Sequence, residues 1–292
     1  SQKTAILEIK QDLAKPSRMN RLLQGDVGSG KTVVALLSLL VAIEAGGQGV
    51  LMAPTEILVQ QHVDNLRPLG DKSGVVVESL TGRDKGKERE RKLAALRTGN
   101  IHILIGTHAV FQSGVDFSDL RLAIIDEQHR FGVRQRLALG EKGSGVDVLV
   151  MTATPIPRSL ALSQYGEMDL TVLSEKPAGR KPVKTVMISD NRVKEIIFKL
   201  KEAIDSNIQA YWVCPLIEES EILDYTAAEE RFKSLRADLG EGKVGLVHGQ
   251  LSPEDKDEVM RKFSQGEIKV LVSTTVIEVG VDVPSASVIV IE

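Results

Sequence analysis

Eight consecutive residues near the start of the chain have the types and spacing needed to hold a nucleoside triphosphate. Residues 25–32 read GDVGSGKT, which is the pattern G-x-x-x-x-G-K-T. The glycines let backbone N–H groups turn inward around an anion, the lysine can reach the β- and γ-phosphates, and the threonine hydroxyl is the usual Mg²⁺ ligand. The residues expected to contact the nucleotide or its metal are Gly25, Gly28, Ser29, Gly30, Lys31 and Thr32.

A pair of carboxylates follows an apolar run later in the chain. Residues 124–129 read IIDEQH, so Asp126 and Glu127 stand at the end of a predicted strand. An enzyme with a phosphate loop needs one carboxylate to hold Mg²⁺ and another to orient the attacking water. We therefore expect Asp126 to hold the metal and Glu127 to act as general base. A solvated strand end is the alternative, and the phosphate loop earlier in the chain argues against it.

Further polar groups stand where they could link nucleotide chemistry to movement. Thr152 and Thr154 end the next predicted strand, which a parallel sheet could place beside the Asp126 strand. Their hydroxyls could bond to Asp126 or His129 and report the state of the γ-phosphate, although an ordinary strand-to-turn transition would look the same. His129 has no companions at metal-ligand spacing, so a hydrogen-bonding relay is the better interpretation.

The elements that must position these groups alternate between strand and helix. A short apolar run, Leu22-Leu23, precedes the phosphate loop, and residues 32–45 form a helical pattern that would place the phosphate at a helix N-terminus. Further predicted strands are 49–52, 75–80, 102–105, 122–125 and 146–151, with helices at 57–66 and 88–96. This alternation predicts an α/β fold with a doubly wound, mostly parallel sheet. Aromatic residues make up only 3% of the chain, which suits strands buried by Val, Leu and Ile.

A polar segment with two prolines, residues 174–182, reads as a linker between two domains. We predict domains at 1–173 and 183–292, with a nucleotide cleft between them. The alternation resumes after the linker. Predicted strands are 183–188, 209–214, 244–247, 270–273 and 287–291, and predicted helices are 193–205, 226–239 and 253–263.

Composition and charge exclude some classes of protein. No apolar run reaches about 18 residues, so we expect no membrane span, and the polar start of the chain does not read as a secretory signal. These features favour a cytoplasmic protein. The net charge of −3 means that any nucleic-acid surface must be local. Arg130, Arg134 and Arg136 are the better candidate for such a surface, because the basic residues at 85–92 are interleaved with Glu88 and Glu90 and predict a solvated helix face.

The ordered set of motifs resembles the motor of superfamily-two helicases. Its segments are QGDVGSGKTVVA (24–35), APTEILVQQH (53–62), GTHAVFQ (106–112), DEQHRFGVRQR (126–136), TATPIPRSL (152–160), HGQL (248–251) and STTVIEVGVDVP (273–284). Within that superfamily the set is most similar to RecG-type bacterial DNA helicases, which remodel stalled replication forks. The resemblance covers essentially the whole chain.

This resemblance implies two RecA-like domains, ATP and Mg²⁺ at their interface, and translocation on duplex DNA by a monomer. It also implies roles for individual residues. Gln2 resembles a glutamine that reads adenine. Gln128, His129, Thr152 and Thr154 match coupling segments. Gly280 and Asp282 match the second-domain segment that faces the nucleotide, though both could be purely structural. Residues matching segments that lie along the nucleic-acid backbone are Thr55, Gly106, Thr107 and His108.

The resemblance leaves competing interpretations. The family's arginine-finger segment is expected after Glu292, so we expect the 292 residues by themselves to bind ATP and to hydrolyse it poorly. A transcription-repair coupling translocase has a related motor, whereas a DEAD-box RNA helicase would carry D-E-A-D where residues 126–129 read DEQH. A nucleotide-binding scaffold without turnover is the alternative from another functional class.

Overall fold

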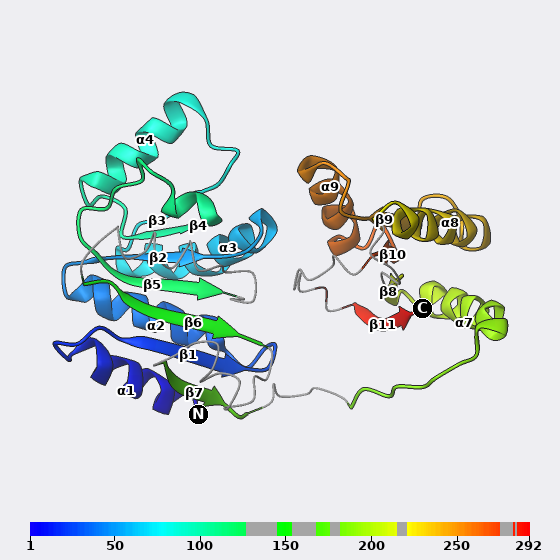
Figure 1. Cartoon of the computed structure of the whole chain (residues 1–292), viewed down its shortest axis with the longest axis horizontal. Helices are drawn as coiled ribbons and strands as arrows, with labels where there is room; N and C mark the ends of the chain where they lie inside the picture. Colours follow the sequence, from blue (N-terminus) through cyan, green and yellow to red (C-terminus); the bar gives the residue numbers. More distant parts are fainter. Residues whose placement is uncertain (127–144, 154–167, 176–181, 215–220, 275–282, 284) are drawn as a thin grey trace. The chain divides into compact units, whose positions relative to one another are not determined.

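The structure is a computed structural model that describes residues 1–126, 145–153, 168–175, 182–214, 221–274, 283 and 285–292. The chain divides into two compact units, Ser1–Pro182 and Val183–Glu292 (Figure 1). Each unit is built around its own sheet, so each is described by itself.

The first unit contains a seven-stranded sheet in which every pairing is parallel. Its order is β3-β4-β2-β5-β6-β1-β7. The strands are β1 (Asn20–Gly25), β2 (Gln48–Met52), β3 (Val77–Leu80), β4 (Ile103–Gly106), β5 (Leu120–Asp126), β6 (Asp147–Thr152) and β7 (Asp169–Leu173). The predicted parallel α/β sheet is therefore confirmed, with strand boundaries shifted by one or two residues.

Helices cover this sheet and fix the loops that follow its strands. They are α1 (Gln2–Leu13), α2 (Lys31–Glu44), α3 (Glu56–Ser73) and α4 (Gly86–Arg97), with a short 3-10 turn η1 (His108–Phe111). Helix α2 packs on α1 and on β1, β2 and β5, whereas α3 packs on β3 and β4. Right-handed crossovers put α2 and α3 on one face and α4 on the other. No helix in the described ranges is both long enough and apolar enough to cross a bilayer.

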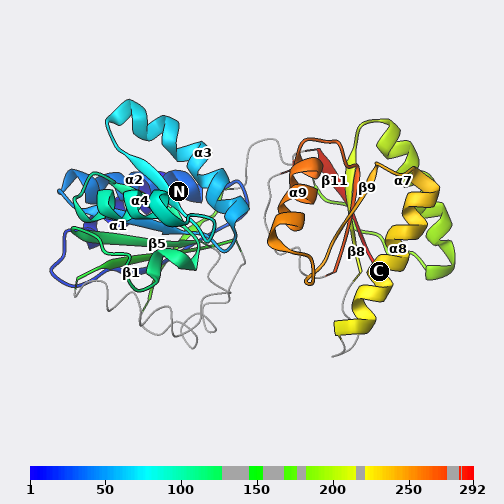
Figure 2. The same cartoon turned by 90° about the horizontal axis from the view of Figure 1, so that it is seen from above.

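The second unit repeats this design on a smaller scale. Its four strands pair in parallel in the order β11-β8-β10-β9. Figure 2 shows α9 on one face of this sheet and α7 and α8 on the other. The elements are η3 (Asp190–Arg192), α7 (Val193–Asp205), β8 (Gln209–Val213), α8 (Glu221–Leu239), β9 (Val244–Val247), α9 (Pro253–Ser264), β10 (Val270–Ser273) and β11 (Ala286–Ile291).

One predicted strand is wrong, and one helix and one strand were not predicted, besides the short 3-10 turns η1 and η3. Residues 183–188 form no strand, and their apolar side chains face solvent, with Met187 99% exposed and Val183 79% exposed. The local pattern is strand-like, but no strand in the described residues pairs with it. The unpredicted helix and strand are α1 and β7, which pack together beside β1.

A buried glutamine closes the base of each sheet in the same way. Gln48 starts β2, and its Nε2 donates to the carbonyls of Leu96 at 3.0 Å and Ile101 at 2.6 Å. Its Oε1 accepts from the backbone N–H groups of Ser118 at 2.6 Å and Asp119 at 3.1 Å.

Gln209 starts β8 and makes the equivalent contacts in the second unit. Its Nε2 donates to the carbonyls of Phe263 at 2.6 Å and Ile268 at 2.7 Å, and its Oε1 accepts from the Ser285 hydroxyl. Each glutamine thus ties its strand to the starts of the two strands that flank it.

Candidate functional site

The candidate site lies along the carboxyl edge of the first sheet. Because all seven strands are parallel, their C-terminal residues meet at one edge. The ends of β5, β6 and β1 are neighbours there, since Asp126 lies opposite Met151 and Thr152 lies opposite Gln24. Thr152 is therefore beside the Asp126 strand, as expected. The phosphate loop and the metal-binding carboxylate predicted from the sequence stand at the same edge, two strands apart.

The phosphate loop joins β1 to α2 and depends on glycine for its shape. Gly28 and Gly30 have φ angles of 78° and 92°, the left-handed region that other residues rarely adopt. Lys31 is the first residue of α2, and its Nζ donates to the carbonyls of Gly25 at 2.7 Å and Asp26 at 3.1 Å. The ammonium group is thus held within the loop that would wrap the phosphates.

The interior of this loop contains a buried polar atom that no described residue contacts by a hydrogen bond. The Ser29 residue is only 6% exposed, and its hydroxyl oxygen has no hydrogen-bond partner among the described residues. Buried polar groups are nearly always paired, so an orphaned one calls for a ligand or an ion. Together with the N-terminus of α2, the loop fits an anionic ligand.

Gln2 contacts the loop itself. Its Nε2 donates to the Ser29 carbonyl at 2.8 Å, and a Cβ atom added to Gly30 would collide with that same amide nitrogen. Helix α1 thus holds the phosphate loop from outside. This contact was not predicted, and the adenine-reading role of Gln2 stays a prediction.

Asp126 has a partner that sequence reasoning missed. Its Oδ2 lies 2.8 Å from Nε2 of His62 on α3, and the two side chains are 13% and 8% exposed. His62 is the last residue of the 53–62 segment, which was singled out only for Thr55. It shares the buried face of α3 with Leu58, Val59 and Leu66. A histidine on that apolar stripe was the signal available in the sequence.

The residues predicted to meet nucleic acid stand at the ends of β2 and β4. Thr55 is the N-cap of α3, and its side chain accepts from the Leu58 N–H at 3.4 Å. Gly106 and Thr107 are buried, and a Cβ at Gly106 would collide with the Leu80 carbonyl. Of these four residues, His108 is the one whose side chain is exposed. Their contact with nucleic acid stays a prediction.

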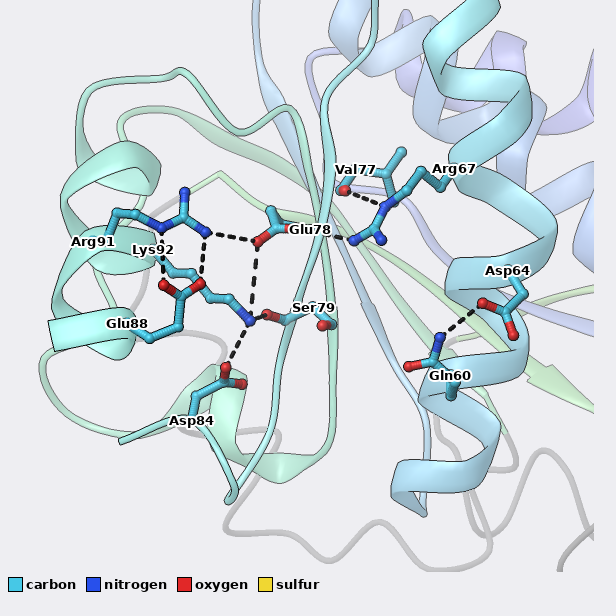
Figure 3. Close-up of polar contacts among 10 residues, drawn as sticks. All are labelled: Gln60, Asp64, Arg67, Val77, Glu78, Ser79, Asp84, Glu88, Arg91 and Lys92. Atoms are coloured by element: carbon cyan, nitrogen blue, oxygen red, sulfur yellow. Dashed lines mark hydrogen bonds and ion pairs between the residues drawn. The ribbon is translucent and has the colours of Figure 1, made fainter. Parts of the chain in front are cut away.

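A polar network fixes the loop between β3 and α4 (Figure 3). Lys92 is buried, and its Nζ donates to Asp84 Oδ1 at 2.6 Å and to the Ser79 carbonyl at 2.9 Å. Asp84 in turn accepts from the Thr81 N–H at 2.8 Å. Lys92 is therefore an internal residue and not part of a solvated helix face.

Thr32 is the second residue of α2. The other predicted site residues lie outside the described residues. They are Glu127, Gln128, His129, Thr154, Gly280 and Asp282, together with the basic candidates Arg130, Arg134 and Arg136.

Two protein families match the chain. The DEAD/DEAH box helicase family matches residues 1–162, and the helicase conserved C-terminal domain matches residues 192–292. Each match lies within one of the two compact units.

Curated relatives match over nearly the whole chain. ATP-dependent DNA helicase RecG from Pasteurella multocida is 52% identical over 290 residues, covering 98% of this chain and 42% of the relative. The proteins of the same name from Escherichia coli strain K12 and Bacillus subtilis strain 168 are 52% and 51% identical, each covering 100% of this chain and 43% of the relative. The chain thus spans about two fifths of the length of these relatives.

Solved structures show the same fold. A RecG bound to a three-way DNA junction superposes with a TM-score of 0.82 at 46% identity, covering 99% of this chain and 37% of that one. Dbp5 of S. cerevisiae bound to RNA and ADP BeF3 gives a TM-score of 0.71 at 19% identity, covering 99% of this chain and 73% of that one. The second likeness, at this identity, concerns the fold alone.

Proposed function

We propose that this chain, which belongs to the DEAD/DEAH box helicase family, is the ATP-driven motor of a DNA translocase that remodels stalled replication forks and other branched DNA. The observation that carries the proposal is the identity of about one half to RecG helicases over the whole chain. The phosphate loop and Asp126 at one sheet edge supply the chemistry that such a motor needs.

The residues of the first unit are suited to bind MgATP. The loop N–H groups and Lys31 would hold the phosphates, with the Ser29 hydroxyl available inside the loop. The oxygens of Thr32 and Asp126 are the hard donors that Mg²⁺ prefers, and Mg²⁺ is usually held by one or two protein oxygens together with phosphates and water. When bound, the metal neutralises charge that develops on the phosphates. Glu127 would accept the proton of the attacking water.

The second unit is proposed to complete the motor. Gly280 and Asp282 are assigned to the nucleotide, and Gln128, His129, Thr152 and Thr154 to the coupling of hydrolysis with movement. Thr55, Gly106, Thr107 and His108 are assigned to the DNA backbone. The motor is proposed to act as a monomer in the bacterial cytoplasm.

ATP hydrolysis measured with different nucleic acids tests this function. The protein containing this motor should hydrolyse ATP faster with forked DNA than with linear duplex, and least with single-stranded RNA. The Lys31→Ala variant is the control for turnover at this site. Equal stimulation by RNA and forked DNA would contradict the DNA assignment, and nucleotide binding without stimulated turnover would indicate a scaffold.

A further inference from the structure

The contact between His62 and Asp126 joins a helix to the carboxylate that we assign to Mg²⁺. Nε2 of His62 lies 2.8 Å from Oδ2 of Asp126, which is hydrogen-bonding distance. The two residues are 64 positions apart in the sequence, so the contact depends on the fold and not on local chain geometry. An ionised carboxylate can only accept, so Nε2–H is the donor.

His62 is buried on the apolar face of α3, so its ring needs a hydrogen-bond partner. His62 is 6% exposed and lies on the face of α3 formed by Leu58, Val59, Val63 and Leu66, each of which is buried. A polar ring on an apolar face is costly unless it is hydrogen-bonded. The Asp126 carboxylate supplies that bond, and the ring that donates it lies among buried apolar side chains.

Helix α3 connects the contact between His62 and Asp126 to the segment around Thr55. The helix begins after Thr55 at the end of β2, and β2 is the neighbour of β5 in the sheet. His62 follows Thr55 by about two helical turns. One helix therefore runs from a loop assigned to DNA to the carboxylate assigned to Mg²⁺.

We infer that His62 is a positioning residue for the magnesium site, an inference that rests on the proposed function. It fixes Oδ2 of Asp126 so that the carboxylate presents its other oxygen to the metal or to a metal-bound water. Groups that hydrogen-bond to metal-binding residues orient them, and loss of such a group typically lowers metal affinity by about 10–100-fold. His62 does not touch the nucleotide in this assignment, so its loss should change the metal dependence of binding more than binding itself.

The test is the Mg²⁺ dependence of binding a fluorescent ADP analogue, measured on the 292-residue chain at constant pH. His62→Ala should raise the Mg²⁺ concentration at half-maximal binding by about 10–100-fold. Its affinity for the analogue in EDTA should match that of the parent. The matched control is Gln60→Ala, which removes an exposed residue of the same helix that bonds only to Asp64 in Figure 3 and should leave the Mg²⁺ midpoint unchanged.

A second pair of variants keeps the test decisive if His62→Ala does not fold. The pair is His62→Gln and His62→Asn. Glutamine can place a donor near the position of Nε2, whereas asparagine is too short. His62→Gln should therefore have a lower Mg²⁺ midpoint than His62→Asn. Equal midpoints in that pair, or a folded His62→Ala with the parent midpoint, would overturn the inference. Failure of the parent chain to bind the analogue at any Mg²⁺ concentration would instead refute the proposed nucleotide site.

Discussion

Replacing Gln48 with leucine should destabilise the first unit and leave the second unit intact. Leucine is similar in length but can neither donate nor accept a hydrogen bond. The backbone N–H groups of Ser118 and Asp119 then lose the Oε1 atom that both of them use. Of the two carbonyls that lose Nε2, that of Leu96 still accepts from the Gly99 N–H at 3.2 Å, so its loss costs little.

The expected loss of stability follows from the two backbone N–H groups and from the Ile101 carbonyl. A buried polar group left unsatisfied costs about 1–3 kcal/mol. Ser118 and Asp119 are exposed residues, so water can partly replace the acceptor of their N–H groups, whereas the buried Ile101 carbonyl loses its donor. We therefore expect the free energy of unfolding of the first unit to fall by about 2–4 kcal/mol. A domain of this size has about 5–15 kcal/mol of stability, so the change is large.

Gln209→Leu is the matched comparison in the second unit. The carbonyl of Phe263 still accepts from the Gly266 N–H at 3.0 Å, and the exposed Ser285 can turn its hydroxyl to water. The Ile268 carbonyl loses its donor, as the Ile101 carbonyl does in the first unit, but no backbone N–H group loses an acceptor. The cost should therefore be about 1–2 kcal/mol, less than that of Gln48→Leu.

Urea unfolding can separate the two units because the chain contains a single tryptophan. Trp212 is fully buried on β8, so its fluorescence reports the second unit, whereas far-ultraviolet circular dichroism reports both. Gln48→Leu should shift a circular-dichroism transition to lower urea without moving the Trp212 transition. An unchanged midpoint for Gln48→Leu, or a larger loss for Gln209→Leu, would refute this account of the two glutamines.

Four further outcomes are expected. Lys31→Ala should abolish tight binding of a fluorescent ATP analogue, because the positive charge that faces the β- and γ-phosphates is lost. Near-parent affinity would contradict the assignment. Glu127→Gln should bind MgATP but lose turnover, since an amide cannot accept the proton, and hydrolysis at the parent rate would point to another base. Burial and the nearby Glu292 carboxylate raise the pKa of Cys214 to about 12, so the native thiol should resist Ellman's reagent at pH 8 while the unfolded chain reacts with one equivalent. Burial lowers the pKa of His248, so the unfolded chain takes up the proton first as pH falls; stability of the second unit, followed by Trp212 fluorescence, should therefore decrease below about pH 6.5, and His248→Gln should remove that slope.

The sequence was sufficient for the parts of the fold that short-range patterns determine. The phosphate loop, its helix α2 and the parallel strands β2, β4, β5 and β6 follow from glycine spacing and short β-branched runs. The neighbouring positions of Asp126 and Thr152 followed from the expectation of a parallel sheet.

The failures of prediction concern contacts between distant segments. The segment 183–188 has a strand-like pattern, but a strand also needs a neighbour, and local sequence does not supply one. His62 was missed because its partner is 64 residues away. Gln2 was named from the resemblance, but its contact with the Ser29 carbonyl was missed because that partner is loop backbone. Gly106 was assigned to nucleic acid, while the structure shows that it also allows close packing against Leu80.

The network around Lys92 has a consequence for how this surface would respond to salt. The sequence offers five basic residues between 85 and 92, but the Lys92 charge is neutralised internally by Asp84, and Arg91 pairs with Glu88 at 2.7 Å. Because the charges of Lys92 and Arg91 are already paired with carboxylates, they are not available to replace counterions of DNA. Nucleic acid bound at α4 would therefore be neutralised by at most Lys85, Lys87 and Arg89. Each phosphate neutralised releases about 0.9 counterion from duplex DNA. Contact through this helix would therefore contribute at most about 2.7 to the slope of log affinity against log salt, in place of the roughly 4.5 that counting all five residues would give.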